Sequence, residues 1–179
     1  MKILLKILGG RAALALVLVV VSFFMPRTFR VERPVVIKAK PEAVYALVAE
    51  LKAWKDWGVW YERDPAMVIA YSPATTGAGA WTEWQSKSQG SGKATIKEIA
   101  APTRMVYDLE FKDDGMLSTG SFLITGAEAG AVRISSVMEG DLGMNPIGQL
   151  MGPILDKMLG PDFEAGLAKM KRIAEGSAK

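Results

Sequence analysis

The sequence contains no cysteine and no histidine among its 179 residues. Without cysteine the chain has neither a disulfide nor a thiolate nucleophile, and without both residue types it has no Cys/His zinc site. The absence of histidine excludes a Ser-His-Asp triad and removes the side chain that ordinarily titrates near neutral pH. The residue inventory therefore assigns no catalytic residue and predicts no metal and no cofactor.

The positive net charge is confined to one end of the chain. Residues 1–33 hold six basic residues and one acid, a net charge of +5, whereas the rest holds sixteen basic and eighteen acidic residues, a net charge of −2. Binding to phosphates requires clustered Lys and Arg. Because the body has no such cluster, we predict that it does not bind nucleic acid.

The N-terminal segment is strongly apolar. Residues 12–25 carry no charge, and the segment becomes 19 residues long if it is counted from Ile7. As a helix that length spans about 28 Å, close to the ~30 Å hydrocarbon core of a bilayer. We therefore predict one membrane-spanning helix that contacts the membrane through residues 7–25, within an anchor segment of residues 1–28.

Two alternatives to the anchor remain open, a cleaved signal peptide and a soluble core helix. A signal peptidase site needs small residues, and the segment ends instead in Phe23-Phe24-Met25-Pro26-Arg27. Basic residues flank the segment on both sides, so the positive-inside rule hardly favours one orientation of the helix in the membrane over the other. We expect a single-pass protein whose domain lies outside the cytoplasm, in the periplasm.

The body reads as one strand, short helices, six strands and a long terminal helix. The first strand covers residues 29–39, with Pro34 suggesting a sheet edge, and a helix opens at Pro41. Turn residues then separate six runs, which predict an antiparallel meander: residues 67–71, 79–87, 93–99, 104–112, 117–125 and 132–140. Asn145 caps the terminal helix, in which we expect a kink at Pro153 and a break at Gly160-Pro161.

Several motifs resemble the START-like superfamily, the polyketide cyclase/dehydrase and lipid-transport group. They are residues 31–48 (VERPVVIKAKPEAVYALV), Trp54-Lys-Asp-Trp57, residues 91–96 and residues 138–143. The resemblance covers residues 29–175 and implies an α+β helix-grip domain, which we place at residues 29–176. In that fold a seven-stranded antiparallel curved sheet wraps a long C-terminal helix and leaves an apolar cavity between them.

Strand alternation indicates which side chains would face such a cavity. The inward faces of the strands, with one residue of the terminal helix, give ten candidate ligand-binding residues: Trp84, Glu98, Tyr107, Leu109, Phe111, Phe122, Ile134, Ser136, Met138 and Met170. The same residues could instead form a filled core. The polar atoms of Glu98, Ser136 and Tyr107 favour a ligand, because a packed core does not need them.

Three functions remain open at this point. The first is a membrane-anchored domain that binds a hydrophobic small molecule or a lipid. The second is an enzyme of the cyclase/dehydratase kind, in which Glu98 or Tyr107 would move protons. The third is a module that binds a protein partner through the sheet or through residues 144–158, which are rich in methionine.

Overall fold

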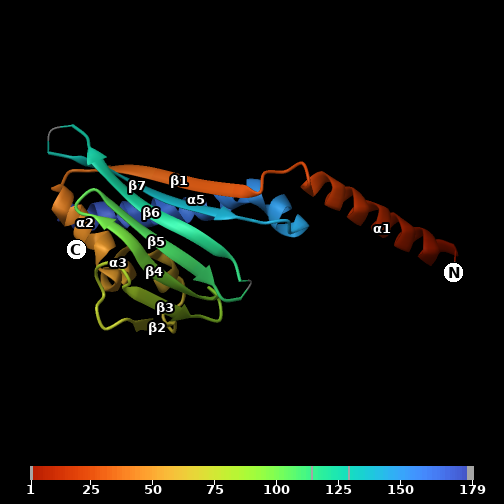
Figure 1. Ribbon diagram of the computed structural model, residues 1–179, viewed down its shortest axis with the longest axis horizontal. Helices are drawn as coiled ribbons and strands as arrows, with labels where there is room; N and C mark the ends of the chain where they lie inside the picture. Colours follow the sequence, from red (N-terminus) through yellow and green to blue (C-terminus); the bar gives the residue numbers. More distant parts are fainter. Residues whose placement is uncertain (1, 114, 129, 177–179) are drawn as a thin grey trace.

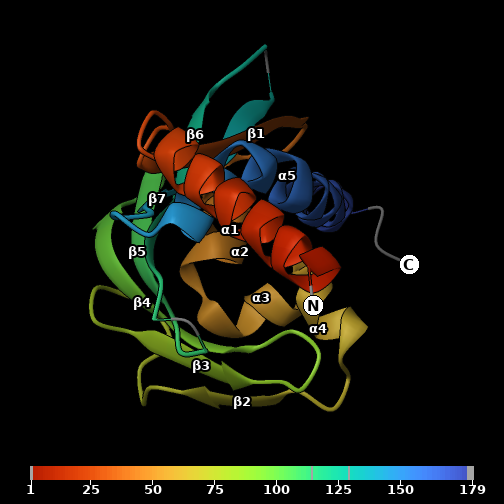
Figure 2. The same ribbon diagram turned by 90° about the vertical axis from the view of Figure 1, so that its right-hand side faces the viewer.

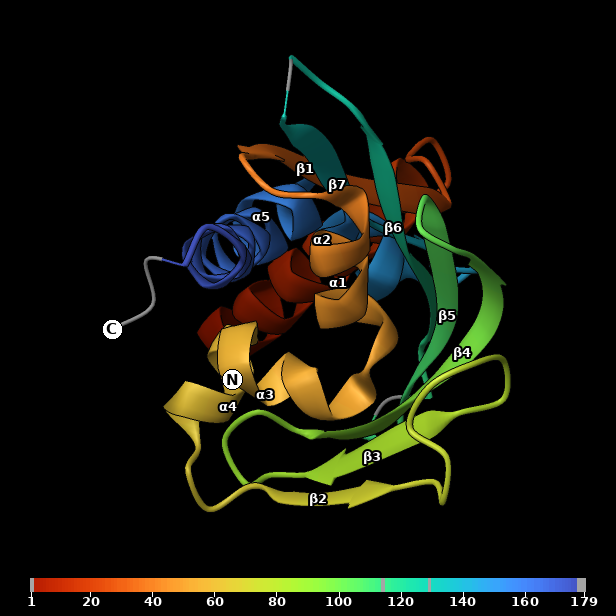
Figure 3. The ribbon, with the colours of Figure 1, turned by 90° about the vertical axis from the view of Figure 1, so that its left-hand side faces the viewer.

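A computed structural model describes residues 2–113, 115–128 and 130–176 of the chain. Within these residues seven strands form one antiparallel sheet, in the spatial order β1-β7-β6-β5-β4-β3-β2. The sheet is strongly curved, and the helices α2 to α5 lie on its concave side (Figure 3). The strands are β1 (Thr28–Ile37), β2 (Val68–Tyr71), β3 (Trp81–Gln85), β4 (Ser91–Ala100), β5 (Arg104–Phe111), β6 (Leu117–Gly126) and β7 (Val132–Asp141).

The helices divide into one long helix along the body, a group of short ones and an N-terminal helix. The N-terminal helix leaves the body at one end of the molecule, whereas the short helices fill the concave side between the long helix and β2 and β3 (Figures 1 and 2). Their bounds are α1 (Lys2–Ser22), α2 (Pro41–Ala49), η1 (Leu51–Ala53), α3 (Trp54–Trp57), α4 (Val59–Arg63) and α5 (Pro146–Ala174).

This architecture confirms the predicted α+β helix-grip fold. The six runs of the predicted meander correspond to β2–β7, and each of β3 to β7 pairs with the strand before it along the chain. Pro34 lies in β1, which is an edge strand. An edge strand tolerates proline because one side of it forms no ladder hydrogen bonds.

The terminal helix differs from the prediction, because α5 runs without a break from Pro146 through Pro153 and Pro161. Each proline removes one backbone donor, but contacts with β1 hold the helix along its length. The Arg33 guanidinium donates to both carboxylate oxygens of Asp156, at 2.8 and 3.0 Å, and to Glu164 at 2.7 Å. Further along, Lys171 Nζ donates to the Val36 carbonyl at 2.7 Å.

The N-terminal expectation of a membrane-spanning helix is not supported. In the part of the chain that the structure describes, no helix has the length and apolar character needed to cross a bilayer. Met1, the first residue of the expected anchor, lies outside the described residues.

The Arg33–Asp156 pair predicts a specific dependence of stability on pH. Its hydrogen bonds lower the pKa of Asp156 below the ordinary value of 3.8. A carboxylate with a lowered folded-state pKa stabilises the fold above its unfolded-state pKa, and that contribution disappears as the pH falls through the folded-state value. We expect Asp156→Asn to melt below the wild type near neutral pH and the gap in Tm to close in acid.

Asp108→Asn is the matched control, since Asp108 is an exposed acid whose ion pair with Lys97 is long, at 3.4 Å. Its melting temperature should stay near that of the wild type across the same pH range. If the Tm of Asp156→Asn stays below that of the wild type in acid, the substitution acts through packing and not through the ion pair.

Candidate functional site

The concave face of the sheet is covered by two different parts of the chain. Helix α5 packs along β1 and against the short helices, while the face of β3–β5 is covered by side chains from α3 and α4. The short helix α3 is tied to α2 by its two tryptophans. Trp54 Nε1 donates to the Val48 carbonyl at 2.8 Å and Trp57 Nε1 to the Leu47 carbonyl at 2.9 Å, and the last carbonyls of a helix need such partners.

Four aromatic rings fill the centre of the interior. Trp54 lies edge-on to Tyr107 with ring centroids 5.0 Å apart, and Tyr107 stacks on Phe122 at 5.7 Å. Trp57 completes the group, 5.8 Å from Phe122 and from Trp54. These separations are those of favourable aromatic packing. Helix α5 contributes Phe163, Leu167 and Met170 to the same buried core, so the protein's own side chains fill this part of the interior.

A smaller cavity remains beside this aromatic cluster. It has a volume of about 120 Å³ and lies between α3–α4 and the inner face of the sheet. A cavity of roughly 150 Å³ with apolar walls is known to hold benzene, so this cavity is of the size of one ring. The lining residues are Trp54, Trp60, Tyr61, Met67, Trp84, Gln89, Tyr107, Leu109, Phe111 and Met138.

Two glycines shape the floor of the cavity. Trp84 pairs with Gly92 across β3 and β4, and Tyr107 pairs with Gly120 across β5 and β6. A Cβ atom at Gly92 would lie 2.4 Å from the Trp84 ring, and one at Gly120 would lie 2.1 Å from the Tyr107 ring. Each aromatic ring therefore lies over the glycine of the neighbouring strand, in the space that a side chain there would occupy.

The cavity walls carry few polar groups. Tyr107 is buried, and burial raises the pKa of its phenol, with a further contribution from nearby Tyr61. Burial likewise raises the pKa of Tyr61, helped by Tyr71. Both phenols are therefore neutral at physiological pH and can donate a hydrogen bond. Gln89, from the turn between β3 and β4, adds an amide.

The structure brings five of the ten predicted ligand-binding residues together at this cavity: Trp84, Tyr107, Leu109, Phe111 and Met138. Four others are buried outside its lining. Phe122 belongs to the aromatic cluster, and Ile134, Ser136 and Met170 are buried elsewhere in the interior. Most of the predicted inward faces are therefore correct, but the part of the interior nearest α5 is core.

Glu98, the tenth candidate, lies on the outer face of the sheet. Its side chain is 58% exposed, and its carboxylate is 3.7 Å from Arg104 Nη1. The prediction failed because the register between β4 and β5 shifts between Ile96 and Glu98. Such a β-bulge inserts one residue and reverses the alternation that follows. Ile96 is buried as predicted, and every residue of β4 after it is exposed.

The sequence prediction missed half of the lining. Trp54, Trp60, Tyr61 and Met67 come from the segment that runs from α3 to the start of β2, and Gln89 comes from a turn. A usable signal was present, because Trp54, Trp57, Trp60 and Tyr61 concentrate large aromatic surface within eight residues. Strand alternation alone does not show that this segment folds over the open half of the sheet.

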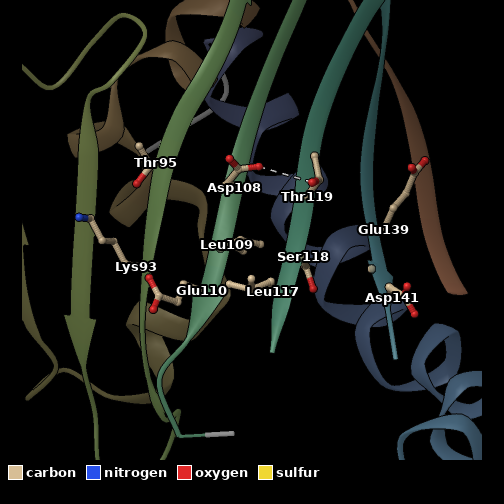
Figure 4. A pocket seen from close by; sticks show the side chains of 11 residues that line it. Lys93, Thr95, Asp108, Leu109, Glu110, Leu117, Ser118, Thr119, Glu139 and Asp141 are labelled. Carbon is tan, nitrogen blue, oxygen red and sulfur yellow. Dashed lines mark hydrogen bonds between the residues drawn. The ribbon is translucent and has the colours of Figure 1, made fainter. Parts of the chain in front are cut away.

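A larger hollow of about 370 Å³ lies on the outer face of the sheet. Figure 4 shows its charged rim, which includes Asp108, Glu110, Glu139, Asp141 and Lys93. These acids occupy the outward positions of their strands, as predicted for Asp108 and Glu110. The inner cavity, by contrast, is walled mainly by aromatic and apolar side chains, and we take it as the candidate site. Among the described residues, no cluster of acids is arranged to hold a metal ion.

The fold and its inner cavity agree with a family assignment from sequence. Residues 28–175 match the family described as polyketide cyclase / dehydrase and lipid transport. The match covers most of the chain, and the protein belongs to this family. No curated protein matches the chain.

Solved structures share the fold at low sequence identity. Protein CV1439 from Chromobacterium violaceum has a TM-score of 0.58 and 20% identity, covering 84% of this chain and 99% of its own. PFC0360w, an HSP90 activator from Plasmodium falciparum, has a TM-score of 0.57 and 12% identity over 81% and 95%. The di-domain ARO/CYC protein BexL has a TM-score of 0.57 and 17% identity over 80% of this chain and 45% of its own. Identities this low establish the fold alone.

The close approach of Tyr107 to Gly120 predicts that Gly120→Ala lowers the free energy of unfolding. The added methyl group would meet the Tyr107 ring at 2.1 Å, and overpacking of this kind costs about 1–3 kcal/mol. Gly126→Ala on the same strand is the matched control, because a Cβ atom there meets nothing within 4 Å. Urea denaturation of the two variants measures the difference, and equal stabilities would contradict the packing described.

Proposed function

We propose that the protein binds a small hydrophobic molecule, or the apolar part of a lipid, in the cavity beneath α3 and α4. The observation that supports this most directly is an open volume of about 120 Å³ walled by aromatic and apolar side chains. Apolar burial favours such a ligand by roughly 25 cal/mol per Å² of surface removed from water. The phenols of Tyr61 and Tyr107 would orient it, in the manner of the few polar groups of most ligand sites.

The size of the cavity limits the ligand class. One aromatic ring or a short branched chain fits the volume, whereas a long acyl chain requires movement of the wall. Trp60 and Tyr61 would have to move, since both are only half-buried and belong to the five-residue helix α4. We therefore favour a compact, flat molecule over an extended lipid chain.

An enzyme of the cyclase/dehydratase kind is the second candidate, supported by the family to which the chain belongs. Glu98 is outside the cavity, so proton transfer would fall to Tyr107 or Tyr61. A general base works best with a pKa near the operating pH, and burial moves both phenols away from that range. Their suitable role is that of neutral donors to a ligand oxygen or nitrogen, which serves binding as well as catalysis.

Filling the cavity should abolish binding. We expect Leu109→Phe, which places extra volume among the lining residues, to weaken the binding of fluorobenzene at least roughly tenfold, as followed by ¹⁹F NMR. Leu123→Phe is the matched control, because Leu123 is 45% exposed on the other face of the sheet. Equal affinities for the two variants, or no binding to the wild type, would refute the proposed site.

The role of the phenol is tested separately with Tyr107→Phe. One hydrogen bond contributes about 0.5–1.5 kcal/mol, so the variant should bind 4-fluorobenzonitrile, which carries a nitrile acceptor, roughly two- to thirteenfold more weakly. Fluorobenzene carries no comparable acceptor, and its affinity should change by less than about twofold on the same energy scale. A parallel loss for both probes would mean that Tyr107 acts only through packing.

A further inference from the structure

Helix α1 presents a continuous apolar surface to solvent. Its last three turns expose Leu14, Leu16, Val17, Leu18, Val19, Val20 and Val21, and Phe23 and Phe24 follow with exposed fractions of 63% and 86%. Isolated exposed apolar residues are normal on protein surfaces, but a contiguous patch of this size marks an interaction site. None of these residues contributes to the inner cavity.

A second apolar element lies next to the end of this helix. The Leu142 backbone N–H donates to the Arg27 carbonyl at 2.6 Å, so the turn after β7 is joined to the segment after α1. Met144 and Ile147, just beyond that bond, are 70% and 73% exposed. We call the surface formed by residues 14–24 of α1 and its end, together with Met144 and Ile147, the apolar tip. Figure 1 shows α1 leaving the body at this end of the sheet.

The charges on the α1 side of the apolar tip are all basic. Lys6, Arg11 and Arg27 are exposed, and the chain contains no acidic residue before Glu32. On the other side of the tip, Asp141 at the end of β7 is an acid, and it accepts the backbone N–H of Gly143 at 2.7 Å. A second copy of the chain would bring like charges together, whereas anionic lipid headgroups neutralise them, at about 1 kcal/mol per basic residue.

From this combination we propose that the apolar tip docks on the surface of a bilayer that contains anionic lipids. The exposed valines, leucines and phenylalanines would enter the boundary between headgroups and acyl chains, and the basic residues would contact the phosphates. The proposal does not depend on the cavity, since it concerns a different part of the surface.

Vesicle flotation of the whole chain of residues 1–179 tests the docking. Phosphatidylcholine vesicles that also contain phosphatidylglycerol should bind the protein at least roughly tenfold more tightly than vesicles of phosphatidylcholine alone. Phe24→Asp and Met144→Asp should each weaken that binding. Ile99→Asp is the matched control, because Ile99 is also about half exposed but lies near the end of β4 that is opposite the tip. The affinity of the same variants for fluorobenzene, measured in parallel, shows independently whether the cavity is intact.

Three results would overturn the proposal. They are equal binding to the two kinds of vesicle, unchanged binding of Phe24→Asp and Met144→Asp, and an effect of Ile99→Asp as large as theirs. A second copy of the chain is the competing partner for the apolar tip, and light scattering of the protein without vesicles tests for it. If the protein does not float with vesicles but forms a dimer that Phe24→Asp dissociates, the apolar tip is a surface for self-association.

Discussion

The structure depends on how a strongly curved sheet buries its concave face. A single helix cannot cover a surface that bends around it, and α5 packs on β1 at one edge while β3–β5 curve away. The chain covers the remaining half with large aromatic side chains on short helices. Because Trp54 and Trp57 donate to the last carbonyls of α2, the position of these rings is fixed by helix α2, and the cavity is the volume that the rings do not fill.

This arrangement explains why half of the cavity lining could be predicted and the other half could not. Strand alternation is a local property, so Tyr107, Leu109 and Phe111 could be assigned to one face from the sequence of β5 alone. Trp60 and Tyr61 face the cavity only because their short helix folds over β3–β5, and that packing involves residues far apart along the chain. An aromatic-rich segment indicates that its side chains are buried, but it does not indicate which part of the protein they pack against.

The two errors about Glu98 and α5 have related causes. A bulge after Ile96 reverses the faces of β4, and no glycine or proline in that strand segment marks it. In α5, Pro153 and Pro161 are local signals for a break, but ion pairs from Arg33 and the contacts along β1 hold the helix together. In both cases a local rule was overridden by an interaction between strands or between a strand and a helix.

The register of the sheet places the cavity and the apolar tip at the same end of the molecule. Thr28 pairs with Asp141, Ser118 with Gly140 and Gly92 with Phe111, so the start of β1, the end of β7 and the turns before β4 and β6 share one end of the sheet. Trp84, Phe111 and Met138 of the cavity lie within a few residues of that end. The apolar tip approaches it from the β1 edge and the cavity from the β3 edge. The two proposed sites therefore share one end of the sheet and lie at its opposite edges.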